Sequence, residues 1–156
     1  MNYNRQSPYN NQAINNNQNS QEMKELITYI KEGIKDINDL KKIFGENGLI
    51  QRFSERDNKS NNQMRKFYSE IVEIYQEISS SSTQTLNKDK INTKLAMIEP
   101  RAYYSKQRNN ITNDFFNFIK EGIETIIITS DNNEWVEKII RFKMVYEAII
   151  AYSTKG

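Results

Sequence analysis

Apolar side chains recur every three to four residues from Trp135 to Tyr152, and this pattern constrains the fold more than any other feature of the sequence. Such spacing predicts an α-helix, and here the apolar positions cover more than half of its circumference. A helix with so wide an apolar surface has to be buried. We therefore expect it at the centre of the domain or at an interface between subunits.

The rest of the chain also favours helices, because it contains only five glycines and two prolines in 156 residues. Apolar spacing predicts helices over 20–44, 60–78, 88–98, 112–128 and 131–152, and a further short helix from Pro100. The length suits one domain. The predicted fold class is therefore all-α, a compact bundle of about five helices.

Local signals set the expected boundaries. Residues 1–19 are rich in Asn and Gln, which predicts a disordered polar tail before a single helical domain over 20–156. Gly33 is expected to weaken the first helix without ending it, and residues 49–59 are expected to form a connector. Ser60 and Gln63 have the form of a capping box. Pro100 should end one helix and begin another, with a sharp corner between them.

The absence of two residue types argues against an enzyme. Without cysteine the chain has no disulfide, no thiolate nucleophile and no cysteine-containing zinc site. Without histidine it lacks the residue most used for acid–base catalysis and for binding metals. We expect no enzymatic activity, no metal and no cofactor. No segment is apolar enough to span a bilayer, so the expected compartment is the cytoplasm.

Positive charge is concentrated in the middle of the chain. Residues 48–110 contain eleven Lys or Arg against seven Asp or Glu, a balance of +4, within a net charge of +2 for the whole chain. Clustered cations favour sequence-independent contact with phosphates. The candidate RNA-binding residues are Arg52, Arg56, Lys59, Arg65, Lys66, Arg101, Lys106 and Arg108. Three acidic residues nearby, Glu70, Glu73 and Glu77, are expected on a solvated outer helix face.

Three segments together resemble a known family. They are the helix start Gln63-Met64-Arg65-Lys66-Phe67-Tyr68, the segment from Leu95 to Arg108 with Tyr four and Arg eight residues after Pro100, and the ending Val145-Tyr146-Glu147-Ala148-Ile149-Ile150-Ala151-Tyr152. In order and spacing they are similar to the small subunit of type III-A CRISPR effector complexes, the Csm type. The chain departs from that pattern at Asn61 and Asn62, at Tyr103 and at Ser153.

The resemblance implies a non-catalytic helical subunit of a ribonucleoprotein. Its copies would stack as a filament and hold the guide RNA–target RNA duplex through the RNA backbone, and they would contact the other subunits of the complex. It also leaves room for a dimer of the isolated chain. Tyr104 falls where the family's tyrosine lies between apolar neighbours, so its ring is expected to pack partly inside. The alternative function is a structural helical adaptor that mediates protein–protein assembly without touching RNA.

Overall fold

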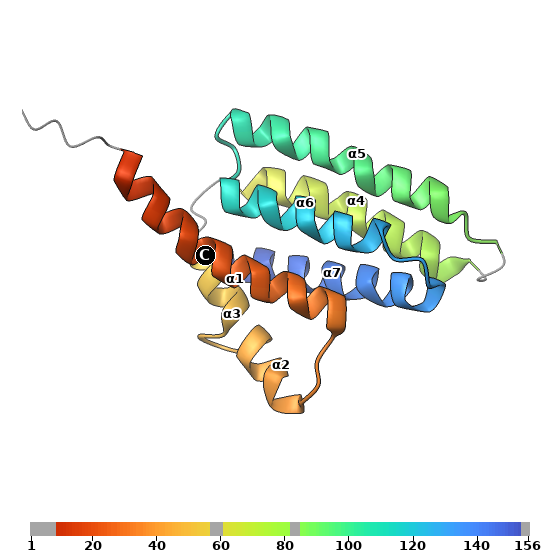
Figure 1. The fold of residues 1–156 in the computed structure, drawn as a ribbon. Helices are drawn as coiled ribbons and strands as arrows, with labels where there is room; N and C mark the ends of the chain where they lie inside the picture. Colours follow the sequence, from red (N-terminus) through yellow and green to blue (C-terminus); the bar gives the residue numbers. More distant parts are fainter. Residues whose placement is uncertain (1–8, 57–60, 82–84, 154–156) are drawn as a thin grey trace, which may run out of the picture.

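The computed structural model describes residues 9–56, 61–81 and 85–153, and this part of the chain forms a bundle of seven helices without a strand (Figure 1). The helices are α1 (Tyr9–Glu32), α2 (Ile37–Phe44), α3 (Leu49–Glu55), α4 (Asn61–Ser80), α5 (Lys88–Gln107), α6 (Asn113–Ile127) and α7 (Asn132–Ser153). The predicted all-α class is confirmed. The observed helices differ from the expected ones at three places in the chain, which are Gly33, residues 49–55 and Pro100.

Helix α7 occupies the centre of the bundle. It packs against α1, α3, α4 and α6, and its residues Trp135, Phe142 and Tyr146 are almost completely buried. Of the two positions expected for this helix, the central one is therefore found. Helix α5 lies on α4 and α6, on the opposite side of the bundle from α2 (Figure 1).

Aromatic rings from α6 and α7 form the middle of the core. Tyr146 meets Phe115 and Phe142 edge to face, and Phe118 lies between Phe115 and Phe142 with centroid distances of 6.0 and 5.4 Å. The two helices approach closely at Gly122, where a Cβ atom would lie 2.4 Å from Cε2 of Phe142. Glycine is needed there because a buried ring occupies the space that a side chain would take.

The first predicted helix is divided into α1 and α2. Gly33 has a φ of +71°, in the left-handed region, so it ends α1 instead of only weakening it. Asp36 then caps α2 by accepting a hydrogen bond from the backbone N–H of Asn38 at 3.0 Å. The prediction of one continuous helix over 20–44 is therefore wrong.

Helix α1 also begins earlier than expected, at Tyr9 instead of Ser20. Residues 9–32 contain neither glycine nor proline, so nothing interrupts a helix whose later turns are held by the burial of Leu26 and Ile30. The helix reaches into the segment predicted to be a tail, whose disorder stays a prediction, and residues 1–8 lie outside the described residues. The division into a tail and one domain stays a prediction.

Residues 49–55 form helix α3 where a connector was expected. Leu49, Ile50 and Phe53 are buried, and their spacing places them on one side of two helical turns. These three side chains anchor the segment to the bundle. Its helical form was missed because it is only seven residues long.

Helix α5 continues through Pro100, so the predicted corner does not exist. The buried residues Ile91, Leu95, Ile98, Ala102 and Ser105 form a continuous stripe on both sides of the proline. Pro100 itself is exposed, as is Ala96, whose carbonyl loses its intrahelical partner and remains accessible to water. Burial of the stripe against α4 and α6 outweighs the lost hydrogen bond.

Side chains from other helices cap several helix ends. The Lys88 ammonium donates to the carbonyls of Thr129 and Ser130, just beyond α6, at 2.7 and 3.0 Å. The Tyr152 hydroxyl donates to the carbonyl of Phe44 at the end of α2, at 2.6 Å. Such contacts satisfy terminal carbonyls that have no partner within the helix. Among the described helices, none is both long and apolar enough to cross a membrane.

Candidate nucleic-acid interface

An open groove of about 470 Å³ lies between the first turns of α4 and the last turns of α5. These two helix ends lie at the same end of the bundle, together with the start of α6 and with α3 (Figure 1). The groove is lined by Gln63, Lys66, Phe67, Pro100, Arg101, Tyr104, Ser105, Arg108 and Asn110. The structure therefore brings together three of the predicted RNA-binding cations, from segments more than thirty residues apart.

The three cations differ in their surroundings. Lys66 and Arg108 are exposed, and no carboxylate among the described residues pairs with either of them. Arg101 instead forms an ion pair with Glu70 of α4, and its Nε donates to the carbonyl of Met97 at 3.2 Å. Lys66 and Arg108 are thus available to an anion in the groove, whereas Arg101 already has one.

Arg108 and Tyr104 form a unit on the surface of α5. Nη1 of Arg108 donates to the Tyr104 hydroxyl at 2.7 Å, and the guanidinium carbon lies 5.5 Å from the centre of the ring. Tyr104 is 60% exposed, so the prediction that its ring packs partly inside is wrong. On this helix the inward positions next to it are Ala102 and Ser105, which are both buried.

One polar contact joins the two walls of the groove, and another fixes α4 to the central helix α7. The Ser105 hydroxyl donates to Oε1 of Gln63 at 3.3 Å, and the Tyr146 hydroxyl donates to the carbonyl of Met64 at 2.7 Å. Sequence reasoning assigned Gln63 to a capping box, whose Ser60 lies outside the described residues. The bond to Ser105 was missed because the two residues are 42 positions apart and no local pattern relates them.

The Lys106 side chain lies over two aromatic rings and not in the groove. Its ammonium lies 4.9 Å from the centre of the Tyr103 ring and 4.6 Å from that of Phe116 on α6, within the range of cation–π attraction. It does not line the groove. Lys106 thus lies away from the side of α5 that carries Arg101 and Arg108.

Three other candidate cations, Arg52, Arg56 and Arg65, are not part of the groove lining. Arg56 forms an ion pair with the largely buried Glu22 of α1 at 3.1 Å, and Nε of Arg52 donates to the carbonyl of Gly48 at 3.3 Å. Arg65 is exposed on α4. Lys59 lies outside the described residues. The RNA-binding role of these four cations stays a prediction.

The acidic residues of α4 meet the cations of α5 in a seam between the two helices. Glu77 accepts from Lys94 at 3.0 Å and lies 3.9 Å from Lys90. Glu70, seven residues before Glu77, pairs with Arg101, seven residues after Lys94. The hydrogen bond from Lys94 is the largest influence on Glu77 and lowers the pKa of its carboxyl group. Glu73 is exposed, whereas Glu70 and Glu77 are half-exposed and form ion pairs with α5 that the sequence did not indicate.

A family model described as Csm2 Type III-A matches residues 46–154, which include α3 to α7 and every residue of the groove. The chain belongs to the Csm2 Type III-A family. This confirms the resemblance: the chain is a small subunit of a type III-A CRISPR effector complex, a role that implies association with other Csm subunits. No curated protein and no solved structure matches the chain.

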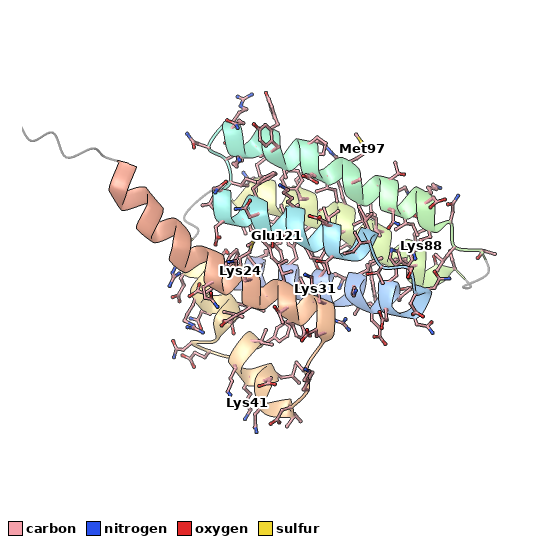
Figure 2. All side chains as sticks on the ribbon, in the orientation of Figure 1. Lys24, Lys31, Lys41, Lys88, Met97 and Glu121 are labelled. Carbon is pink, nitrogen blue, oxygen red and sulfur yellow. The ribbon has the colours of Figure 1, made fainter. Side chains whose placement is uncertain are left out.

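The matched region sets α1 and α2 apart from the rest of this Csm2 chain, since both end before residue 46. Another open pocket, of about 620 Å³, lies among α1, α2 and α3 and includes both acidic and basic residues. Figure 2 shows Lys41 of α2 on the opposite side of the bundle from Met97 of α5. The basic groove and this cavity are thus separate surfaces of the molecule.

The described part of this Csm2 chain offers no recognisable metal centre. Within residues 9–56, 61–81 and 85–153, no three acidic side chains are grouped so that they could hold an ion. The chemistry of the groove is that of cations and neutral hydrogen-bonding groups at an open surface. Such a lining can bind an anion and orient it.

Proposed function

We propose that this Csm2-family subunit holds RNA in the effector complex through the groove between α4 and α5. Its copies stack along the guide RNA–target RNA duplex, each contacting the sugar–phosphate backbone, and the subunit itself catalyses no reaction. The observation that supports this proposal is the convergence of Lys66, Arg101 and Arg108 on one groove. The family membership supplies the setting, a type III-A effector complex.

The composition of the groove suits a phosphate backbone better than base edges. Lysine provides a point charge, and arginine provides a planar fork that matches two phosphate oxygens. Gln63, Ser105 and Asn110 add neutral polar groups beside these cations. Contacts of this kind hold a strand in position without reading its sequence. Specificity is then delegated to pairing between the guide and the target.

The small size of the groove also supports the proposed stacking of copies. A groove of about 470 Å³ accommodates only a few groups of an RNA strand. A single subunit with two available cations therefore binds RNA weakly. Several grooves aligned along one duplex would act together, because each bound copy raises the effective concentration of RNA at the next. The proposed partners are the guide RNA, the target RNA, further copies of this chain and the neighbouring Csm subunits.

The proposal is tested by changing the two available cations together. We expect Lys66→Gln combined with Arg108→Gln to weaken binding of the full chain to an RNA duplex by about tenfold at 0.1 M salt. The slope of log K against log salt should become shallower by about 1.5, since each phosphate contact contributes about 0.7 to 0.9. Fluorescence anisotropy over a salt series measures both quantities.

A matched control carries the same change of charge on the opposite side of the bundle. Lys41→Gln combined with Lys42→Gln removes two exposed cations from α2. This control should leave the slope within about 0.3 of the original value. Equal losses in the two double variants would mean that RNA responds only to net charge. No loss in the groove variant, together with normal assembly of the complex, would favour the structural adaptor.

A further inference from the structure

The Arg101–Glu70 ion pair stands at the boundary between two grooves, and only the second of them is lined by carboxylates. On one side lies the basic groove described above, with Lys66 and Arg108. On the other side, further along the seam of α4 and α5, lies a groove of about 300 Å³ lined by Glu70, Glu73, Ile74, Thr93, Lys94, Met97 and Arg101. Arg101 contributes to both grooves, and Glu70 faces the second one.

The Glu70 carboxylate is held in place. Its side chain is 28% exposed, against 46% for Arg101, and its Oε1 pairs with Nη1 of Arg101. Its other oxygen, Oε2, is buried and accepts no hydrogen bond from the described residues. The Arg101 fork is fixed as well, because Nε donates to the Met97 carbonyl at 3.2 Å. The negative charge of Glu70 therefore stays beside Arg101.

A carboxylate paired with an arginine occupies the position that a phosphate would take, since both anions offer two oxygens to the same fork. We propose that Glu70 is a specificity-determining residue that ends the phosphate track at Arg101. Its carboxylate competes with RNA for the guanidinium, so that phosphates are bound at Lys66 and Arg108 only.

This inference rests on the proposed function and adds a limit to it. This limit can be measured through the salt dependence of RNA binding, because an arginine whose charge is already neutralised by a carboxylate releases no counterion when RNA binds. Arg101 should therefore contribute little to the salt dependence of the original protein. Once Glu70 is neutral, Arg101 should contribute to the salt dependence as much as one phosphate contact does.

The experiment compares three variants of the full chain by the salt series described above. Glu70→Gln keeps the shape of the side chain and frees Arg101. It should tighten binding by about threefold at 0.1 M salt and make the slope steeper by about 0.7 to 0.9, the contribution of one phosphate. Arg101→Gln alone should change the slope by less than about 0.3. The double variant Glu70→Gln with Arg101→Gln should lose the gain.

A control separates this effect from a general change of charge. Glu73→Gln removes the same charge from the same helix, one turn away and without touching Arg101. It should leave the slope unchanged, and thermal unfolding of every variant checks that the bundle is intact. The inference is overturned if Glu73→Gln steepens the slope as much as Glu70→Gln, or if Arg101→Gln alone flattens it as each groove cation does. Failure of the proposed function is recognised separately, since the Lys66 and Arg108 variant would then also bind RNA like the original chain.

Discussion

The guanidinium of Arg141 on α7 donates from Nε to the carbonyl of Ile30, 2.9 Å away, in the last turn of α1. A second nitrogen, Nη2, lies 3.3 Å from the carbonyl of Lys31. A cation at the C-terminal end of a helix meets both unpaired carbonyls and the negative end of the helix dipole. The central helix of the matched region therefore holds α1, which lies outside it.

Replacing Arg141 by methionine keeps the aliphatic stem and removes these hydrogen bonds. We expect the free energy of unfolding to fall by about 1 to 2 kcal/mol, the range for hydrogen bonds from a charged donor and for a cation at a helix end. Guanidinium chloride unfolding followed by circular dichroism measures the change. Lys120→Met, at an exposed position on α6, should shift the free energy by less than about 0.5 kcal/mol. Equal effects of the two substitutions would show that the Arg141 contacts contribute nothing.

The close approach of α6 and α7 makes Gly122 sensitive to a single methyl group. In Gly122→Ala the new Cβ would lie 2.4 Å from Cε2 of Phe142, a ring that its neighbours Phe118 and Tyr146 prevent from moving away. Although alanine favours helices, overpacking should lower the free energy of unfolding by about 1 to 3 kcal/mol. Glu124→Ala, at an exposed position of the same helix, should not destabilise. A Gly122→Ala protein as stable as the original would contradict the packing described for this crossing.

The ion pair of Glu77 and Lys94 predicts a dependence of stability on pH. Because the pKa of Glu77 is lower in the folded chain than its ordinary value of 4.5, the pair stabilises the fold above that value. This contribution is lost as the pH falls through the lowered pKa. The original chain should exceed Glu77→Gln in stability by about 0.5 kcal/mol at pH 7, and the difference should vanish in acid, once the Glu77 carboxyl group is protonated. A difference that persists or grows in acid would exclude this role for the pair.

Substitution of two tyrosines is expected to change the free energy of unfolding by different amounts. Tyr146→Phe removes a buried hydrogen bond to the Met64 carbonyl and should lower the free energy of unfolding by about 1 kcal/mol. Tyr104→Ala removes a ring that is mostly in solvent and should change it by less than about 0.5 kcal/mol. Thermal unfolding of both variants tests this ranking. The reverse order would restore the expectation that Tyr104 packs inside.

Much of the fold could be predicted because local chemistry and burial agree along most of the chain. Thr112 and Asp131 cap α6 and α7 through bonds to the N–H groups of Phe115 and Glu134, as their sequence positions indicate. The apolar spacing of α7 identifies its buried residues. Prediction failed where one influence opposed another: at Pro100, packing of α5 outweighed a helix-breaking residue, and at Gly33 a backbone preference outweighed a continuous apolar pattern.

The site could be predicted only in part, because a groove depends on how helices meet. Sequence reasoning selected Lys66, Arg101 and Arg108 from their charge, and the structure places them together. It could not relate Glu70 to Arg101, since the register of α4 against α5 is set by packing and not by local sequence. For the same reason Lys106 could not be assigned to the Tyr103 and Phe116 rings on the adjoining surface.

The most direct test of RNA contact at the groove is ultraviolet crosslinking of the assembled effector complex, followed by mapping of the crosslinked peptides of this subunit. Exposed tyrosines beside a bound strand are well placed to stack on bases or sugars and to crosslink. We predict that the crosslinks lie in the segments 63–67 and 100–110, with Tyr104 among the modified residues. Crosslinks confined to α1 and α2, or an uncrosslinked subunit in a complex that is fully assembled on RNA, would contradict the account.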